Sequence, residues 1–176
     1  MRGQMRDAVA RRLRLDPYKR VTFRRVTLDR RTRAAFLWAE KRYRAVAPRK
    51  RGPLRIGQGS WSAGSLSGTT HAGGGALDVM FAGLNAKQRR ATVKWFRRAG
   101  FSYWPRVGPI WGANGSNDHG HGILRGHRTA SAAAKAQVES YDTGRNGLAD
   151  NAADWTWKPR RSRRFSYRQN KPIIGK

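Results

Sequence analysis

Two histidine-bearing segments constrain this chain more than any other feature of its sequence. Residues 70–78 read THAGGGALD, and residues 118–122, about forty positions further on, read DHGHG. Together they hold three of the four histidines in the chain. The glycines at 73–75 let the backbone turn sharply and let a neighbouring group approach closely. A fold that brings the two segments together would place His71, Asp78 and a second histidine in one cleft.

The second segment has the alternation of a short strand. Side chains alternate between the two faces of a strand, so His119 and His121 would point to the same side. Asp118 would stand at the start of the strand, where the backbone can bend. The two segments then offer two nitrogens and a carboxylate for one metal ion, with a spare carboxylate beside them. Three protein ligands and an open position for water are typical of a catalytic zinc site.

The composition limits the ligands that such a site can use. The chain has no cysteine, so any metal ion must be held by His, Asp or Glu. The alternative is that the first segment is a loop histidine and a strand-end aspartate without a shared role, and the second a solvated turn. His127 lies next to Arg128 and is expected to be exposed and outside the site.

The formal net charge is +28 and the sequence pI is about 11.9. A charge this large favours an anionic partner, such as DNA, RNA, an anionic membrane surface or an acidic cell-wall polymer. The histidine-bearing middle is the least basic part of the chain. We therefore expect a basic N-terminal segment at 1–26, a catalytic domain at 27–150 and a basic C-terminal tail at 151–176, which is open beyond the arginine run at 160–164. The alternative is an arginine-rich but merely solvated surface.

The hydrophobic pattern predicts helices and short strands that do not alternate regularly. Thr27 is expected to cap the first helix, and Asn85 and Gly100 are typical of the start and end of the second. Helices are predicted over 28–45, 86–99 and 130–141, and strands over 21–26, 54–61, 75–81, 101–104 and 119–124. This order favours an α+β fold with a small, mostly antiparallel sheet flanked by helices.

A wider pattern links the histidine segments to a known family. A Ser/Thr-x-His sequence, a glycine-rich turn ending in Ala-x-Asp and a downstream His-x-His follow one another in residues 69–121. This pattern resembles the zinc D-alanyl-D-alanine metallopeptidases, which share a fold with the hedgehog signalling domain. It is most similar to the phage and actinobacterial endolysin peptidases of that group, over about residues 27–150.

The resemblance implies specific roles for these side chains. Zn²⁺ would be held by His71, Asp78 and His121, and the metal-bound water would attack an amide carbonyl. His119 would line the cleft and stabilise the transition state. Asp118 stands where many members of the family carry a glutamate as general base, and its side chain is one methylene shorter. The resemblance thus implies a zinc metallopeptidase of the carboxypeptidase or endopeptidase type.

The resemblance also implies a substrate and a place of action. Peptidoglycan stem peptides or cross-links would be cut at the bacterial cell wall, and the basic surface would bind anionic wall polymers. Many family members hold the substrate carboxylate with an arginine that residues 59–62 lack, which favours an endopeptidase. Residues 1–13 carry no apolar core of the ~7–15 residues typical of a signal peptide. We expect synthesis in the host cytoplasm and release by another factor, with no membrane span.

Three other interpretations stay open. The charge and the aromatic residues interleaved with basic ones would also suit a nucleic-acid-binding protein. These aromatic residues are Phe23, Tyr43, Trp155, Trp157, Phe165 and Tyr167. Residues 118–121 loosely resemble the turn of a metal-dependent nuclease, and a non-catalytic member of the same fold is the third interpretation. Trp61, Trp104 and Trp111 could wall a substrate groove or belong to the core.

Overall fold

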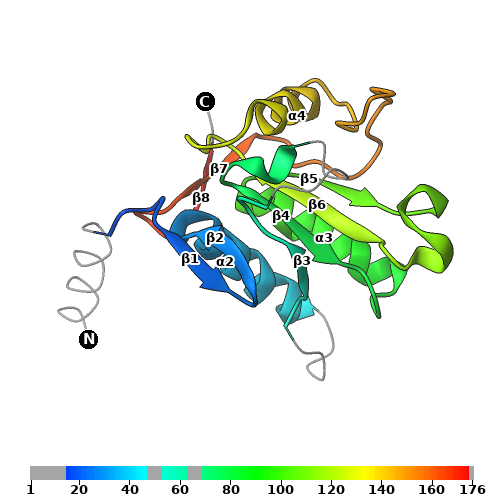
Figure 1. The fold of residues 1–176 in the computed structure, drawn as a ribbon, viewed down its shortest axis with the longest axis horizontal. Coiled ribbons are helices and arrows are strands. Elements are labelled where there is room, and N and C mark those ends of the chain that lie inside the picture. The colour runs from blue at the N-terminus through cyan, green and yellow to red at the C-terminus, as the bar shows by residue number, and fades with distance from the viewer. Residues whose placement is uncertain (1–14, 47–52, 63–68, 175–176) are drawn as a thin grey trace.

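The computed structural model describes residues 15–46, 53–62 and 69–174. They form an α+β fold with three α-helices and three small antiparallel sheets (Figure 1). The elements are β1 (Arg20–Phe23), β2 (Val26–Asp29), α2 (Arg30–Val46), β3 (Ile56–Gln58), β4 (Ala76–Met80), α3 (Ala86–Ala99), β5 (Phe101–Arg106), β6 (His119–Leu124), α4 (Ala132–Asp142), β7 (Arg163–Ser166) and β8 (Lys171–Ile174). This confirms the predicted fold class.

The central sheet has four antiparallel strands in the order β3-β4-β6-β5. The two histidine-bearing segments meet in its middle, because β4 pairs with β6 so that Asp78 lies opposite His121. On the other side of β6, Trp104 lies opposite His121 and Arg106 opposite His119. Side-chain alternation therefore puts Asp78, His119, His121, Trp104 and Arg106 on one face of the sheet.

The opposite face of the sheet packs against α2 and α3 and forms the main core. Val79, Phe101 and Tyr103 are fully buried there, and the Tyr103 ring stacks on Phe96 of α3 with centroids 4.7 Å apart. Tyr103 also lies across β6, where a Cβ added at Gly120 would collide with its hydroxyl oxygen. The glycine of the His-Gly-His run is thus required by packing on one face, while the histidines occupy the other.

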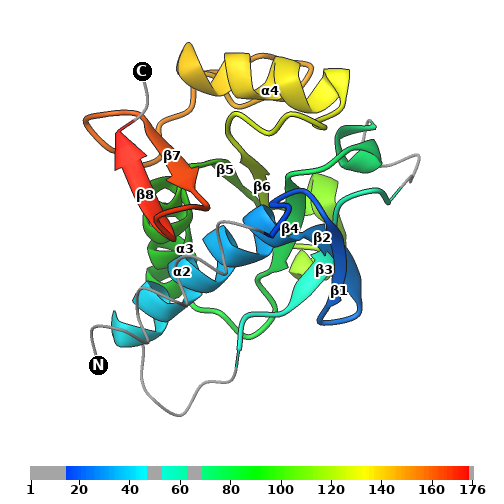
Figure 2. The ribbon, with the colours of Figure 1, turned by 90° about the vertical axis from the view of Figure 1, so that its left-hand side faces the viewer.

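The helix α4 covers only part of the histidine-bearing face. A second, smaller core cluster joins Ala76 of β4, Ile123 of β6 and Trp104 of β5 to Ala134 and Tyr141 of α4. Figure 2 shows α4 on the opposite side of the molecule from α2 and α3. Beyond this cluster the rest of the face is left uncovered by the helix, and this uncovered part contains the site described below.

The helix α3 confirms its prediction in detail. Asn85 and Gln88 form a capping box, in which each side chain accepts a hydrogen bond from the other residue's backbone N–H. The helix ends at Gly100, whose φ of 98° lies in the left-handed region that favours glycine. Val93 and Phe96 are buried as expected, whereas Ala91 and Trp95 are only partly buried.

The start of α2 differs from its prediction. Thr27 does not cap the helix, because residues 26–29 pair with β1 in a hairpin that also contains Leu28. The helix begins two residues later, where the buried Asp29 accepts hydrogen bonds from the Thr32 backbone N–H at 2.8 Å and from the Thr32 hydroxyl at 2.6 Å. Asp29 is therefore the N-cap, and the predicted strand at 21–26 is in fact a pair of strands.

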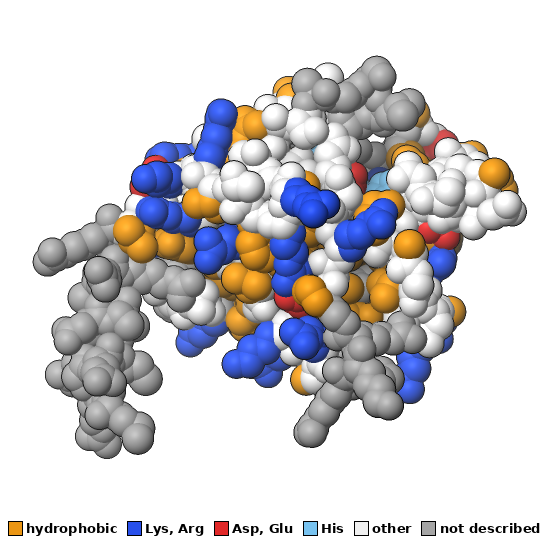
Figure 3. Space-filling model, turned by 60° about the horizontal axis from the view of Figure 1, so that its bottom comes forward, with side chains coloured by type: hydrophobic (Ala, Val, Ile, Leu, Met, Phe, Trp, Pro, Cys, Tyr) orange, Lys and Arg blue, Asp and Glu red, His pale blue; other side chains and the backbone are white. Residues whose placement is uncertain are grey.

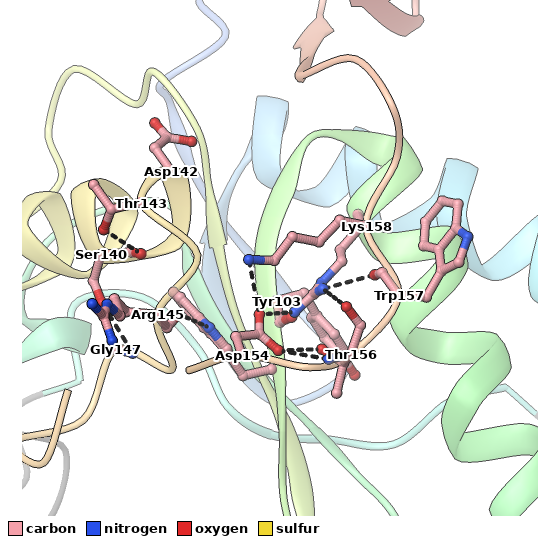
Figure 4. A network of polar contacts seen from close by, with 12 residues as sticks. Tyr103, Ser140, Asp142, Thr143, Arg145, Gly147, Asp154, Thr156, Trp157 and Lys158 are labelled. Atoms are coloured by element: carbon pink, nitrogen blue, oxygen red, sulfur yellow. Dashed lines mark hydrogen bonds and ion pairs between the residues drawn. The ribbon is translucent and has the colours of Figure 1, made fainter. Parts of the chain in front are cut away.

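The C-terminal region is not an open tail, so this prediction was wrong for the residues described up to 174. The strands β7 and β8 form a hairpin beside α2 and α3, and Phe165 is buried in the main core (Figure 2). Residues 154–158 are also tied to α3. The fully buried Arg97 bonds Asp154 at 2.7 Å and the Trp157 carbonyl at 2.7 Å (Figure 4). Burial of Phe165 and the hydrogen bonds of Arg97 therefore hold this basic C-terminal region against the domain, although its charge predicted a solvated segment.

Two further predictions concern ends of the chain and its environment. Of the basic N-terminal segment 1–26, the first fourteen residues lie outside the described part, and residues 20–26 belong to the β1–β2 hairpin. Within the described residues, no helix combines the length and apolar character needed to cross a membrane.

Figure 3 shows Lys and Arg side chains spread over one face, with few acidic side chains among them.

Candidate metal centre

His71, Asp78 and His121 meet on the uncovered face of the sheet, and all three are buried. The Nε2 atom of His71 lies 3.4 Å from Nδ1 of His121 and 3.4 Å from Oδ2 of Asp78. The Nδ1 atom of His121 lies 2.8 Å from Oδ1 of Asp78. One ligand atom from each residue thus lies within 4.8 Å of the others, and the group could hold a metal ion.

The local chain path explains how three sequence positions converge. His71 lies on a short 3-10 turn, Thr70–Ala72, directly before the glycine run. Gly74 and Gly75 pack against the His127 ring so closely that a Cβ on either would require the ring to move. The chain then enters β4, which carries Asp78 to its position opposite His121. The glycines between the turn and β4 are therefore required because the chain packs closely against His127 there.

The outer nitrogen of each histidine ligand is fixed by a hydrogen-bond acceptor. His71 Nδ1 donates to the Gly59 carbonyl oxygen at 2.7 Å, because a carbonyl oxygen can only accept. His121 Nε2 donates to Oε1 of Gln137, on α4, at 2.9 Å. In the neutral form of each ring, the inner nitrogen then has a lone pair directed at the shared space. Bonds of this kind orient metal-binding histidines and set their tautomers.

The spacing of the ligand atoms fits a tetrahedral ion. Bonds of about 2.0–2.1 Å to zinc imply ligand atoms about 3.3–3.4 Å apart. Two of the three separations, both from His71 Nε2, are 3.4 Å, and the third, between His121 and Asp78, is shorter at 2.8 Å. Two imidazoles and one carboxylate suit zinc and also bind other divalent transition metals. The residues present therefore fit the predicted zinc set.

The charges of the three groups are strongly coupled. Burial acts to raise the pKa of Asp78, but the adjacent histidines, His121 foremost, hold the pKa well below its ordinary value. Burial acts to lower the pKa of His71, but the Asp78 carboxylate raises it above its ordinary value. Burial lowers the pKa of His121 in spite of its hydrogen bond to Asp78. Asp78 is thus an ionised carboxylate shared between two imidazoles.

The metal-binding group lines a cavity of about 950 Å³ on this face of the sheet. Side chains from β3, β4, β5 and β6 form its floor, and the loop 107–117 and α4 form its walls. The lining includes Arg55, Gln58, His71, Asp78, Met80, Arg106, Ile110, Trp111, His119, His121 and Gln137. His71, Asp78 and His121 are therefore accessible from this cavity.

His119 lines the cavity beside the metal-binding group, as predicted. Its Nδ1 atom donates to the Asn117 carbonyl oxygen at 2.7 Å, which leaves Nε2 as the nitrogen able to exchange a proton. The Trp111 ring meets the His119 ring edge-on with centroids 5.2 Å apart. A histidine fixed in one tautomer next to a metal site can act as a general base or as a hydrogen-bond donor.

Asp118 lies elsewhere, on the α3 side of the sheet. Its carboxylate accepts hydrogen bonds from Arg89 Nη1 at 2.7 Å and from the Gly108 backbone N–H at 3.1 Å. It is buried and is not among the residues that line the cavity. The alternation that points His119 into the cleft turns the preceding residue away from it. The geometry does not support the predicted role of general base, which stays a prediction.

His127 is not exposed, and this prediction was wrong. Its side chain is buried, and its Nε2 atom lies 2.8 Å from Oδ2 of Asp29, the N-cap of α2. The Tyr18 ring packs edge-on against it with centroids 5.0 Å apart. Asp29 and His127 are 98 positions apart, so the neighbouring arginine in the sequence was a poor guide to burial. His127 nevertheless lies outside the cavity lining, as expected.

The three tryptophans considered for a groove have three different positions. Trp104 is in the core at 1% exposure, and its ring stacks on His121 with centroids 6.2 Å apart. Trp111 is partly exposed and lines the cavity. Trp61 is partly buried, lies under the guanidinium of Arg20, and is not among the lining residues. Only Trp111 is therefore a groove residue.

The aromatic residues interleaved with basic ones are mostly unavailable for stacking on nucleic-acid bases. Tyr43 and Phe165 are buried in the main core, and Phe23 and Tyr167 pack against it. Trp155 is 93% exposed and Trp157 is 42% exposed. The structure therefore leaves two of the six aromatic residues on the surface.

Gln137 and Arg106 are among the polar side chains of the cavity that sequence reasoning missed. Gln137 binds His121 from α4, and Arg106 projects from β5, which extends two residues further than predicted. The additional part of the strand contains Pro105. Proline is tolerated there because β5 is an edge strand of the central sheet. Alternation from Trp104 would have found Arg106.

Comparison with known proteins gives no match. No family model matches the chain, and no curated protein and no solved structure matches it. A function can therefore be inferred only from the site itself, which is a buried two-histidine, one-aspartate group at a cavity that His119 also lines.

Proposed function

We propose that this protein is a zinc-dependent peptidase with a hedgehog/DD-peptidase-like fold, which hydrolyses an amide bond in the peptides of the bacterial cell wall. The observation that carries the proposal is the convergence of His71, Asp78 and His121. Their inner ligand atoms face one point, their outer nitrogens are fixed by the Gly59 carbonyl and Gln137, and the point opens onto a cavity.

The same geometry favours catalysis over a purely structural metal. Structural zinc sites are closed by four protein ligands, whereas catalytic sites have three and an open position. Among the described residues the metal-binding group has three members, and it lines a cavity instead of being sealed in the core. The order of the ligands along the chain is also that of the resemblance described above.

Each residue of the cavity then has a definite task. His71, Asp78 and His121 would hold the ion, and zinc in such a site supplies Lewis-acid activation of water and of the scissile carbonyl. His119, with Nε2 free, takes the proton of the attacking water and returns it to the leaving amine, a role we assign to it in place of Asp118. Trp111 and Ile110 form an apolar rim that excludes water from the bound peptide.

The charge of +28 supports a polyanionic environment for the substrate. Cell-wall polymers carry carboxylates and phosphates, and attraction to them would concentrate the protein at the wall in a salt-sensitive way. Figure 3 shows Lys and Arg side chains spread over one face of the molecule, and two arginines, Arg55 and Arg106, line the cavity. Association with the wall would thus use side chains outside the cavity.

The proposal is tested by incubating the zinc-loaded protein with purified peptidoglycan sacculi and measuring the release of free amino groups. We expect release that stops on chelation and returns when zinc is added. His119→Ala should lower the rate about 100- to 10,000-fold while zinc stays bound. Lys135→Ala, on the exposed side of α4, is the matched control and should leave the rate unchanged.

Two results would contradict the proposal. The first is the absence of amine release by protein that contains zinc. The second is release that is the same with chelator as without it. Binding to DNA that weakens steeply with salt and is unaffected by chelation would instead favour the nucleic-acid interpretation, which the net charge of +28 keeps as the second candidate.

A further inference from the structure

We propose that the guanidinium of Arg106 binds a carboxylate of the substrate, and that this arginine makes the cavity selective for acidic peptides. The inference rests on the proposed function for the statement that the ligand is a peptide. The carboxylate could come from the C-terminus of the peptide or from an acidic side chain, and the experiment below distinguishes the two.

Arg106 is placed beside the metal-binding group by the register of the sheet. It lies directly opposite His119 on the neighbouring strand, and Trp104, two residues earlier, lies opposite His121. Residues two apart on a strand share a face, and opposed residues across an antiparallel pair have Cβ atoms about 4.5–5.5 Å apart. The arginine therefore lines the same cavity as the three ligands, from the β5 side.

Its guanidinium is buried, and it forms no ion pair with any carboxylate of the described residues. The residue is 4% exposed, and Nη2 is buried without a hydrogen-bond partner. Two other arginines of the described residues are buried: Arg97 pairs with Asp154 at 2.7 Å, and Arg31 donates hydrogen bonds to the backbone carbonyls of Phe165 and Arg125. The nearest carboxylate of the metal-binding group, Asp78, is already shared by two histidines.

Burying a cation without an anionic partner lowers the stability of the fold, so the position of Arg106 needs an explanation. Burial lowers the pKa of Arg106 to about 10, so the side chain still carries its charge at neutral pH. Leaving a buried charge without a partner is strongly destabilising. An anionic ligand that enters the cavity would supply the missing partner, and the binding free energy would include relief of that cost.

The rings of Trp104 and Trp111 orient the Arg106 guanidinium so that it can bind a planar anion. Its Cζ atom lies 5.3 Å from the ring centroid of Trp104 and 5.8 Å from that of Trp111. Contacts with aromatic faces stabilise a guanidinium and limit its motion. A guanidinium forms paired hydrogen bonds with a carboxylate in one plane, which lysine cannot do.

This assignment bears on the arginine that residues 59–62 lack. The absence of a basic side chain there favoured cleavage inside a peptide over cleavage next to a free carboxylate. Arg106 offers the same chemistry from the opposite edge of the sheet, since residues 59–62 follow β3 and Arg106 ends β5. A substrate held by its carboxylate would then lie across the sheet, from β5 towards His71.

The experiment measures equilibrium binding by calorimetry with four short N-acetylated peptides. One pair differs only in a free C-terminal carboxylate against a C-terminal amide. The other pair has an amidated C-terminus and differs only in a Glu against a Gln side chain. For the zinc-loaded wild type we expect at least about tenfold tighter binding of the acid within one pair, which identifies the source of the carboxylate.

Two variants locate the preference. Arg106→Gln should abolish the acid-over-amide ratio, and Arg106→Lys should retain part of it through its charge. Arg55→Gln is the matched control, because Arg55 also lines the cavity but is exposed, and the ratio should survive there. Repeating the titrations with chelator should leave the ratio largely intact, since the preference is assigned to the arginine.

The proposal is overturned if wild-type protein binds acid and amide peptides equally, a result that needs no variant to fold. It is also overturned if the ratio survives in folded Arg106→Gln protein but disappears on chelation, because the metal would then be the carboxylate receptor. The titrations with chelator measure binding without turnover. A failure of the peptidase assay with an intact acid preference, or the reverse, therefore separates this inference from the proposed function.

Discussion

The chain buries two histidine–aspartate clusters that look alike in sequence terms and differ in what surrounds them. In one, His71 and His121 share Asp78 at the floor of a cavity. In the other, His127 bonds Asp29 at 2.8 Å, and both side chains are sealed in the protein interior. The two clusters are neighbours in the fold, because the glycine run after His71 packs on the His127 ring.

The two clusters differ in how many of their nitrogen and oxygen atoms already have hydrogen-bond partners outside the cluster. Asp29 accepts two hydrogen bonds from Thr32 and lies within hydrogen-bond distance of His127 Nε2, which completes an N-cap. Around Asp78 the inner nitrogens have only the other members of the cluster as partners, and these atoms face open space. Burial of histidine next to aspartate is thus not enough to indicate a metal site, whereas ligand atoms that converge on a cavity are compatible with one.

The sharpest test of this comparison is zinc content. His71→Ala should lower the zinc bound from about one ion per chain to none, because two ligands do not hold the ion tightly. His127→Gln, which can still donate a hydrogen bond to Asp29, should keep one zinc per chain. Elemental analysis of the purified proteins measures both. Equal zinc in the two variants would remove the distinction between the clusters.

The structural cluster should dominate stability instead. Asp29→Ala removes the N-cap of α2 and leaves His127 without its partner, so we expect a loss of about 3 kcal/mol in the free energy of unfolding. Denaturant unfolding of metal-free protein measures it. Asp142→Ala, which breaks an exposed pair with Arg125, is the control and should cost less than about 1 kcal/mol. A loss for Asp29→Ala no greater than the control would contradict a structural role.

A smaller effect is expected from the side chain that orients His121. Gln137→Ala removes the acceptor of the His121 Nε2 proton and should weaken zinc binding about 10- to 100-fold. Gln137→Glu, which restores an acceptor, should recover much of the affinity. Competition with a chromogenic chelator measures the affinity. Unchanged affinity in Gln137→Ala would show that the neighbouring groups alone orient the imidazole.

The smallest expected effect is a change in the free energy of unfolding at acidic pH. Burial acts to raise the pKa of Asp29, but His127 and Thr32 bring it below its ordinary value of 3.8. A lowered pKa means that the charged carboxylate stabilises the fold above about pH 3.8 and that this stabilisation is lost as the pH falls below it. Asp29→Asn should therefore be less stable than wild type at pH 5, and the gap should narrow towards pH 3. A gap that widens on acidification would contradict the sign.

Patterns local in sequence predicted much of this molecule. The capping residues Asn85 and Gly100 fixed both ends of α3, and the alternation of residues 119–124 predicted a strand with both histidines on one face. The metal-binding group His71, Asp78 and His121 was predicted from spacing and resemblance, and its members do meet. Short-range signals suffice where the determining contacts are made within a few residues or by simple alternation.

The errors occurred where a distant partner decides the outcome. Asp29 was not seen as a cap because residues 26–29 pair with β1, and His127 was assigned to the surface because its partner is 98 positions away. Phe165 draws the C-terminal hairpin into the core although arginines surround it in the sequence. The general-base role of Asp118 comes from the resemblance alone and stays a prediction; its carboxylate accepts a hydrogen bond from Arg89, a residue 29 positions away on α3.

The loop 107–117 forms part of the cavity rim, and its sequence can change independently of the residues at the centre of the cavity. It carries Ile110, 79% exposed, and Trp111, yet it is fastened by Asp118 to Arg89 and to its own Gly108 backbone, on the side of the sheet away from the ligands. Insertions or sequence changes between these fixed points can reshape what the rim accepts without moving His71, Asp78 or His121. New specificities could therefore be grafted onto this scaffold, by selection or in the laboratory, while its chemistry is kept.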